Sequence, residues 1–394
     1  MNRRHDIDAL RVLAFGLVIL YHVAMYYVAG WPWHLKSPHA AEWLQLPMRS
    51  LNLWRMDLVF LISGLALGFL QRDRGAGALW RERSWRLLLP LLFGMAVIVP
   101  FQAYAQGVAN GRIAPGFGAF LLRYAGGGPW PKNAFDGSDF GVTWNHLWYL
   151  PYLWVYTTVL VLLLPLLHSV AARRLRRGFT GLRGWALLSV PALPLMAWSL
   201  ALWPHFPPTH DLIHDGWLHA VYFTLFLYGW WIGTDEGWWA EASRLRWAAL
   251  GIALALLALY LGLGVLPAEL AAPRQLLRLT ADVYLWTALL AILGWGHVKL
   301  NHPWRWLPWA RESVYPWYLL HQTLIIALAW WLASLHLGPL GEPLLLLNAT
   351  VLGCWGLTAL VRRSAWWRPL FGLGPCPAKA PSPDAAARRG RAAF

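Results

Sequence analysis

The chain has 394 residues, of which 58% are hydrophobic and only 13% charged, and its formal net charge is +15. A soluble domain carries roughly 25% charged residues, so this composition excludes a soluble globular fold, and it is too apolar for a disordered chain. A collagen-like repeat and a disulfide-stapled secreted module are excluded too, since there is no Gly period and only two Cys, which leaves an all-α, polytopic membrane helix bundle.

Ten apolar runs follow one another along the chain, each close to the roughly 20 residues that a helix needs to cross a bilayer. We predict membrane spans at 9–29, 56–71, 86–106, 146–168, 185–203, 217–233, 247–265, 279–298, 313–334 and 343–361. The first run is too long for a signal-peptide core, so we expect it to be retained. Residues 1–371 then form one transmembrane domain, and the Pro-, Ala- and Arg-rich residues 372–394 form a basic, disordered cytoplasmic tail.

The basic residues are distributed unevenly between the two sides that these spans define. With the N-terminus in the cytoplasm, 25 of the 33 Lys and Arg fall on cytoplasmic segments. This asymmetry predicts an N-in, C-in protein that crosses the bacterial inner membrane many times. The basic residues form short clusters between apolar runs, so we expect the lipid bilayer, and no nucleic acid, as their partner. Nothing in the sequence specifies an oligomeric state.

The first run contains two ionisable residues, Arg11 and His22, which are costly inside a bilayer. Eleven residues are close to a whole number of helical turns, so both side chains leave one face of the helix, roughly 16 Å apart. Asp8 lies one turn before Arg11 and can pair with it. Two interpretations stay open on geometry alone. Either both side chains face a functional cavity, or Arg11 reaches lipid head groups while His22 bonds to a neighbouring helix.

The spacing Arg11-x10-His22 resembles the first-span hallmark of membrane acyltransferase family 3. Further matches follow in the same order as in that family: Arg55-Met56-Asp57 through Ser63-Gly64, Arg83-x-x-Arg86, His146-Leu147-Trp148-Tyr149, and Tyr318-x-x-His321. The resemblance covers most of residues 5–361, although Tyr149 stands where the family has Phe. The tract Trp33-His34-Leu35-Lys36-Ser37 is similar to the glucan-biosynthesis branch of the family, which is associated with succinylation of periplasmic glucans.

This resemblance implies an integral-membrane O-acyltransferase that moves an acyl group, succinyl or acetyl, from cytoplasmic acyl-CoA to a hydroxyl of a periplasmic glucan or other polysaccharide. Acyl-CoA is then a co-substrate, and no other cofactor is expected. His22 acts as general base with Arg11 beside it, or as the nucleophile of an acyl-His intermediate. The implied donor-binding residues are Arg11, Arg83, Arg86, Tyr318 and His321; the implied acceptor-binding residues are Asp57, His146, Trp148 and Tyr149.

Other interpretations apply to the weaker candidates. His146 either orients the acceptor or is an interfacial structural residue, and His321 either contacts the donor or bonds within the bundle. Ser63-Gly64 is more typical of close helix packing than of a nucleophile. His205, His210, His214 and His219 flank Asp211 and Asp215, but in a Pro-rich loop we expect no metal site.

Most of the 30 Trp belong to an interfacial aromatic belt. A few near the outer face, Trp33 among them, are candidates for stacking on sugar rings. Two alternative functions remain for the protein. One is a secondary transporter or flippase for an anionic or acylated solute, and the other is a membrane scaffold without chemistry.

Overall fold

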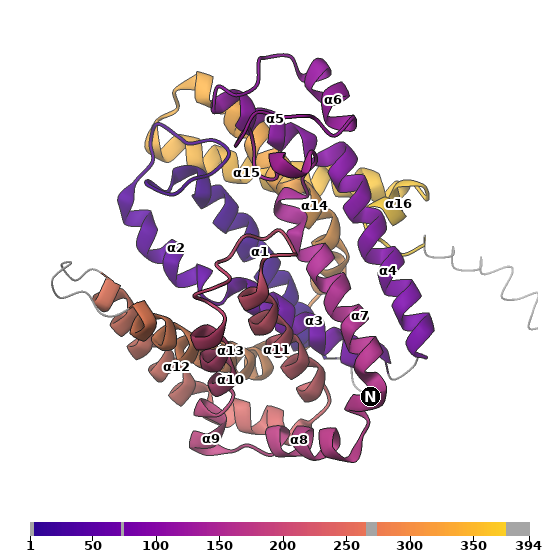
Figure 1. Ribbon diagram of the computed structural model, residues 1–394, viewed down its shortest axis with the longest axis vertical. Helices are drawn as coiled ribbons and strands as arrows, with labels where there is room; N and C mark the ends of the chain where they lie inside the picture. The colour runs from indigo at the N-terminus through magenta and orange to yellow at the C-terminus, as the bar shows by residue number, and fades with distance from the viewer. Residues whose placement is uncertain (1–3, 72–74, 265–273, 376–394) are drawn as a thin grey trace, which may run out of the picture.

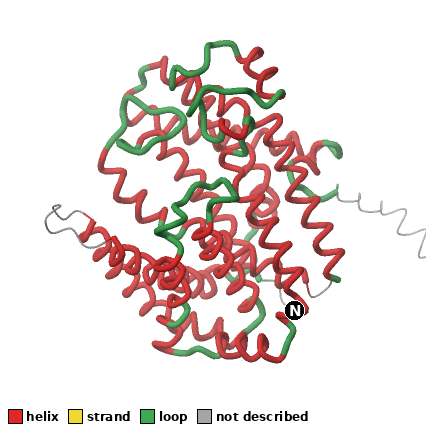
Figure 2. The backbone as a smooth tube through the Cα atoms, in the orientation of Figure 1, coloured by secondary structure: helices red, strands yellow, loops and turns green. Residues whose placement is uncertain are grey.

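The computed structural model describes residues 4–71, 75–264 and 274–375, and these form a helical bundle (Figures 1 and 2). Within those ranges there is no β-strand, only an isolated bridge between Val28 and Ala41. The α-helices are α1 His5–Tyr27, α2 Gln45–Asn52, α3 Arg55–Gln71, α4 Ala76–Phe93, α5 Pro100–Ala109, α6 Phe117–Ala125, α7 Tyr149–Leu167, α8 Val170–Thr180, α9 Gly184–Ser189, α10 Ala192–Ala201, α11 Gly216–Ile232, α12 Glu236–Gly264, α13 Arg274–Leu300, α14 Leu307–Leu332, α15 Gly338–Arg363 and α16 Trp367–Leu370. Short turns lie at η1 Glu42–Leu44, η2 Gly94–Ile98, η3 Ser138–Phe140, η4 Asn145–Trp148 and η6 Ala333–Leu335.

The predicted polytopic helix bundle is confirmed, with a refinement in the number of long spans. Among the described residues, eight helices are long and apolar enough to cross a membrane, and the bent pair Ala76–Ile98 and Pro100–Ala109 makes a ninth. The predicted run 217–233 is also helical, but α11 has only 17 residues and is largely buried against other helices. All ten apolar runs are therefore helices, and α11 is the one that falls short of a full span.

Two predicted boundaries change in the structure. The second span begins earlier than 56, because η1, α2 and α3 together form an apolar segment of 30 residues, Glu42–Gln71. Of the residues that the sequence assigns to the tail, Gly372 and Leu373 are buried in the bundle, whereas Gly374 and Pro375 are exposed. The rest of the predicted tail, 376–394, lies outside the described residues.

Helices α3 and α11 approach each other at two glycines. A Cβ atom on Gly64 would lie 1.9 Å from the backbone oxygen of Phe226, and one on Gly229 would lie 2.0 Å from that of Leu61. Only glycine permits such close backbone contact. This agrees with the packing interpretation of Ser63-Gly64, since the Ser63 hydroxyl is also used, bonding to the Val59 carbonyl oxygen at 2.7 Å.

The third span bends by 42° between α4 and α5. A π-helical turn, η2, ends α4, and Pro100 then begins α5 without an N–H to continue the ladder. The bend turns α5 toward α14, where Gln102 bonds to Thr323 at 2.6 Å. A break in one span thus places a polar side chain in the interior.

Helices α1 and α14 cross the middle of the bundle side by side (Figure 1). They run parallel, because Asp8 of α1 pairs with Arg311 near the start of α14, and His22 meets His321 farther along both helices. We use "N-terminal side" for the end of the bundle where α1 and α14 begin, and "far side" for the end where they finish. The outward faces of α12 and α15 expose Trp247, Leu254, Leu344 and Leu352, as lipid contact requires.

Candidate functional site

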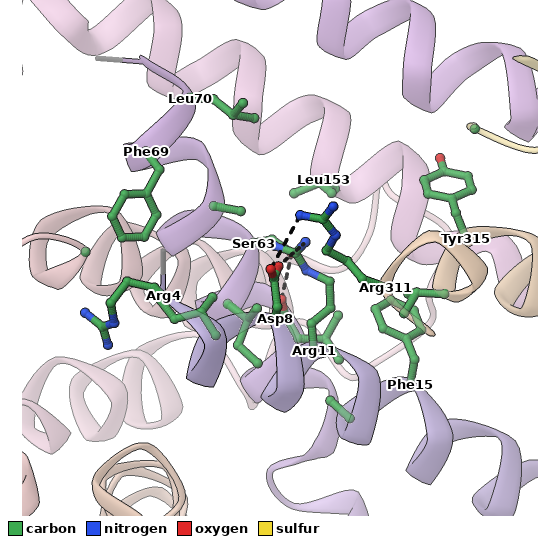
Figure 3. A pocket seen from close by; sticks show the side chains of 18 of the residues that line it. Arg4, Asp8, Arg11, Phe15, Ser63, Phe69, Leu70, Leu153, Arg311 and Tyr315 are labelled. Atoms are coloured by element: carbon green, nitrogen blue, oxygen red, sulfur yellow. Dashed lines mark hydrogen bonds and ion pairs between the residues drawn. The ribbon is translucent and has the colours of Figure 1, made fainter. Parts of the chain in front are cut away.

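A cavity of about 1250 Å³ opens on the N-terminal side of the bundle, between α1, α3, α4, α7 and α14 (Figure 3). Its volume exceeds the roughly 300–1,000 Å³ of most small-molecule sites. Five arginines line it: Arg4, Arg11, Arg83, Arg86 and Arg311. The acidic residues in its wall are Asp8, Glu236 and Glu312. Cations thus outnumber anions in the wall, which favours an anionic ligand.

The positive charge of this arginine cavity is only partly neutralised. Asp8 lies between two guanidinium groups, 3.9 Å from Arg11 and 3.5 Å from Arg311 (Figure 3). Arg83 has a buried Nε with no hydrogen-bond partner among the described residues. Arginine binds phosphate oxygens through paired N–H donors in one plane. The cavity therefore has the chemistry of a phosphate site.

Four of the predicted donor-binding residues meet in this cavity, and the fifth lies elsewhere. Arg11, Arg83, Arg86 and Tyr318 all line it, whereas His321 does not. Sequence reasoning overlooked Arg4 and Arg311 as cavity residues. Arg311 is separated from His321 by ten residues, nearly the spacing of Arg11 and His22 on the parallel helix. Ten residues are about 2.8 helical turns, so this spacing does not put Arg311 and His321 on one face, and the sequence contains no clear signal for Arg311.

His22 faces His321 rather than lipid, and the pair fixes which nitrogen of His22 is free. Nδ1 of His22 lies 2.8 Å from Nε2 of His321. Nδ1 of His321 lies 2.8 Å from the carbonyl oxygen of Tyr318, which can only accept, so His321 carries its proton on Nδ1. His22 must then donate from Nδ1 to Nε2 of His321. Nε2 of His22 is left with a lone pair, and His22 is partly exposed while His321 is fully buried.

His146 lies in the interior, next to His321, instead of at the outer interface. Its ring centroid is 5.1 Å from that of His321. Nδ1 accepts from the Gln102 amide at 3.2 Å, and Nε2 donates to the carbonyl oxygen of Tyr318 at 3.1 Å. The Tyr318 hydroxyl donates back to the His146 carbonyl oxygen at 2.7 Å. With both nitrogens engaged, His146 holds α14 in place and has no free atom for an acceptor.

The other predicted acceptor residues do not converge on one surface. Tyr149 lines the arginine cavity and bonds to the Ser63 hydroxyl at 2.5 Å. Trp148 packs on His210, with ring centroids 4.4 Å apart. Asp57 is buried in α3. Adjacent residues at the start of α7 point in different directions because their side chains are spread around a helical turn, so the predicted acceptor set is not a single site.

Three aromatic rings in the wall of the arginine cavity pack on one another and form what we call the ring layer. The ring centroids of Phe15, Tyr149 and Tyr318 lie 6.2, 5.5 and 5.9 Å apart in pairs. All three residues line the cavity, and His22 does not. His22 therefore lies outside the lining of the arginine cavity, although Arg11 on the same helix is part of it.

Comparison with known proteins places this site in a family. The profile described as "Acyltransferase domain" matches residues 4–359, nearly the whole described chain and both ends of the α1–α14 pair. The chain belongs to this acyltransferase family. The family membership makes this chain an acyl-transferring membrane enzyme.

The curated relatives of this acyltransferase align over a limited region. The glucans biosynthesis proteins C of Escherichia coli O6:K15:H31 (strain 536 / UPEC) and of Escherichia coli (strain K12) are each 26% identical to it over 165 residues. The aligned region covers 41% of this chain and 38% of each relative, so the chain spans less than half of their length. No solved structure gives a significant match.

The acyltransferase has a second buried cation beside His22. Arg55 is 6% exposed, and its Nε and Nη1 have no hydrogen-bond partner among the described residues. Its guanidinium lies 3.4 Å from the ring centroid of Tyr21, the residue before His22. Two nitrogen atoms of this buried guanidinium therefore lack a hydrogen-bond acceptor among the described residues, which is costly in a buried site.

The His- and Asp-rich loop before α11 is tied up in local bonds. Asp215 accepts from the hydroxyls of Tyr152 and Thr209 and from backbone amides, and Asp211 pairs with His214 at 2.6 Å. Burial opposes the shift, yet the bonds from His214 lower the pKa of Asp211 below its ordinary value. In the described part of the chain, no three His, Cys, Asp or Glu side chains are placed to hold a metal ion.

Proposed function

We propose that this protein transfers an acyl group from cytoplasmic acyl-CoA to a hydroxyl of a periplasmic glucan or related polysaccharide, in the bacterial inner membrane. The observation that carries the proposal is the pairing of His22 with His321. It leaves a lone pair on Nε2 of His22, a partly exposed residue on one of the two helices that line the arginine cavity. Acyl-CoA is the co-substrate, and succinyl and acetyl are the candidate acyl groups.

The arginine cavity is the donor site in this proposal. Arg11, Arg83 and Arg311 bind the phosphates of CoA, and Arg83 contributes the guanidinium with an unpartnered nitrogen. The pantetheine arm then extends along α1 and α14 toward His22. For the thioester to arrive, the rings of Phe15, Tyr149 and Tyr318 must separate, so donor entry is a gated step.

His22 supplies the base. Its Nε2 takes the proton of the acceptor hydroxyl while the hydroxyl oxygen bonds to the thioester carbonyl carbon. The tetrahedral intermediate then collapses, the C–S bond breaks, and the proton passes from His22 to the departing CoA thiolate. His321 stabilises the imidazolium by accepting from its Nδ1–H, in the way that the third member of a catalytic triad orients its histidine.

Arg55 is the group available to stabilise the oxyanion of that intermediate. It is buried near His22, it has unpartnered N–H donors, and its position over Tyr21 is fixed before the reaction. Preorganised donors of this kind contribute about 10²–10³ in rate. In the alternative two-step route, Nε2 attacks the thioester itself and an acyl-His forms; rapid quenching without acceptor separates the two, because only that route leaves acyl on the enzyme.

The proposal is tested by mass spectrometry of periplasmic and surface glycans from cells with and without the gene. Loss of a fixed acyl mass from one glycan identifies donor and acceptor together. His22→Ala must reproduce that loss while the protein remains in the membrane. Full acylation by His22→Ala would remove His22 from the mechanism.

The donor site is tested separately with the purified protein in nanodiscs. Arg83→Ala/Arg86→Ala is expected to raise the KM for acyl-CoA at least tenfold with little change in acceptor KM. An unchanged donor KM would contradict the phosphate-binding role. Arg49→Ala, on α2 and away from the cavity lining, is the matched control for loss of positive charge.

A further inference from the structure

A second cavity, of about 490 Å³, lies on the far side of the bundle. It is formed by the end of α1, the loop at Trp33–Lys36, the end of α5 and the last turns of α14. Helices α1 and α14 therefore line both cavities, one at each end. The volume lies within the roughly 300–1,000 Å³ of small-molecule sites.

The wall of this far-side cavity combines flat aromatic surface with a few polar groups. Trp33 and Trp330 contribute indole rings, and His34, Lys36 and Asn110 contribute polar atoms. Aromatic faces pack on the C–H faces of sugar rings, while hydroxyls need nearby hydrogen-bonding groups. No acidic residue is found among the described lining residues, and the Lys36 ammonium is held by carbonyl oxygens of Met25 and Val28 at 2.7 and 2.6 Å. Because two carbonyl oxygens already accept from the ammonium, the wall offers a sugar ring aromatic surface and further hydrogen-bonding groups.

His34, a residue of this wall, has an unused hydrogen-bond donor that is itself buried. The side chain is 4% exposed, and its Nε2 lies 2.6 Å from the amide nitrogen of Asn145. Oδ1 of Asn145 accepts from the Gln322 amide at 3.3 Å, so the Asn145 nitrogen is the donor to His34. The proton of His34 is then on Nδ1, which has no partner among the described residues.

The buried surroundings of His34 keep its imidazole in the neutral form at neutral pH. Burial lowers the pKa of His34 below its ordinary value, although Asp136 and the bond to Asn145 oppose the shift. The imidazole therefore stays neutral, with one acceptor nitrogen used and one N–H free. Buried N–H groups without a partner are rare and costly, so this one indicates a ligand.

The loop that carries Trp33 and His34 is anchored. Buried Glu342 on α15 accepts from the Tyr27 hydroxyl at 3.1 Å and from the Ser37 hydroxyl at 3.0 Å. The backbone N–H of Ser37 bonds to the Tyr26 carbonyl oxygen at 3.0 Å. The far-side cavity is thus a preformed site, and ligand binding does not require the loop to become ordered.

We propose that the far-side cavity is the acceptor subsite, binding a neutral sugar ring between Trp33 and Trp330 with a hydroxyl on Nδ1 of His34. Tyr26 in its wall is one helical turn, about 6 Å, beyond His22 on α1. Asn145 joins His34 to Gln322, the neighbour of His321. A sugar bound here therefore directs the next hydroxyl of its chain toward His22. This inference rests on the proposed function, because it assigns the acceptor of that same reaction.

The test uses full-length protein in nanodiscs and a neutral glucan oligosaccharide as the probe. Trp330→Ala is expected to raise the acceptor KM at least tenfold, with donor KM unchanged and kcat retained at saturating acceptor. Trp331→Ala is the matched control, since the next residue along α14 does not line the cavity and is 58% exposed. Equal acceptor KM values for Trp330→Ala, Trp33→Ala and wild type would overturn the assignment.

The role of His34 is tested by two amide substitutions. His34→Asn places an amide near the former Nδ1 and is expected to retain more acceptor affinity than His34→Gln, whose amide replaces Nε2. A higher acceptor affinity in His34→Gln than in His34→Asn would show that the bond to Asn145 matters and the free N–H does not. That result would overturn the proposed contact between His34 and the sugar.

Direct binding distinguishes failure of the site from failure of the proposed function. The oligosaccharide is titrated onto the protein without acyl-CoA, with the change in Trp fluorescence as the readout. Binding that Trp330→Ala abolishes and Trp331→Ala preserves supports the subsite even if no acyl-CoA is turned over. Transfer by wild type with no change of affinity in Trp330→Ala supports the proposed function and overturns the subsite.

Discussion

The tautomer of His22 is set by a residue 299 positions away in the sequence. Because carbonyl oxygens of α14 hold the proton of His321 on Nδ1, His321 can only accept from His22. The free Nε2 of His22 is thus a property of the α1–α14 pair. The sequence identified both histidines as candidates, and for His321 it left open a contact with the donor or a hydrogen bond within the bundle.

Replacing His321 tests this positioning role. His321→Leu is expected to lower kcat about 10²-fold, within the range of general acid–base effects, with little change in donor KM. His321→Gln keeps a side-chain oxygen as acceptor and is expected to restore part of kcat. Steady-state kinetics with separate kcat and KM values measure both effects. If the Gln variant were as impaired as the Leu variant, the hydrogen bond would not be what positions His22.

Arg55 gives a prediction in which stability and activity change in opposite directions. Arg55→Met removes a buried, unpartnered charge, so Tm is expected to stay level or rise. If the guanidinium stabilises the oxyanion, kcat falls about 10²-fold in the same variant. Thermal unfolding in detergent and the transfer assay measure the two quantities. A fall in both would indicate that Arg55 is structural.

At the scale of helices, the close contact of α3 and α11 depends on two residues without side chains. Gly229→Ala is expected to destabilise the protein by about 1–3 kcal/mol, because the new Cβ would overlap backbone atoms of Leu61. Gly251→Ala, on α12, is the control, since a Cβ there meets nothing within 4 Å. Comparison of the two Tm values checks the prediction, which fails if both variants unfold at the same temperature.

The ring layer in the wall of the arginine cavity also depends on helix packing, because its rings come from α1, α7 and α14. Phe15→Ala is expected to increase CoA release without acceptor several-fold, because a gap in the layer lets thioester and water meet near His22. Leu13→Ala, on the exposed face of the same helix, is the control. A thiol-reactive dye measures the released CoA, and an unchanged rate would show that Phe15 does not limit entry.

At the scale of the whole molecule, the two cavities open at opposite ends of the α1–α14 pair. In sealed proteoliposomes, acyl-CoA is therefore expected to support transfer only from the side that carries the N-terminus, and the acceptor only from the other side. Acyl-CoA is too highly charged to cross the bilayer unaided. Transfer with donor and acceptor supplied on the same side would contradict this arrangement.

The sequence by itself determined the helical membrane architecture and the ten apolar runs. These follow from apolar length and the 3.6-residue period, which are local properties of a chain in lipid. It also placed Arg11, Arg83 and Arg86 together, because all three lie near the same ends of their runs. Arg4 and Arg311 were missed as cavity residues, because their positions in the sequence do not show which helices pack together.

Only the tertiary structure decided which groups meet inside. His146 lies at the start of an apolar run, where an interfacial position is expected, but the bundle carries that turn inward to bond with Gln102 and α14. The pairing of His22 with His321, the ring layer and the unpartnered nitrogens of Arg55 and His34 likewise depend on contacts between distant segments. Hydrophobic periodicity specifies which face of a helix is buried, whereas helix packing specifies which buried polar atoms find partners and which stay free for a ligand.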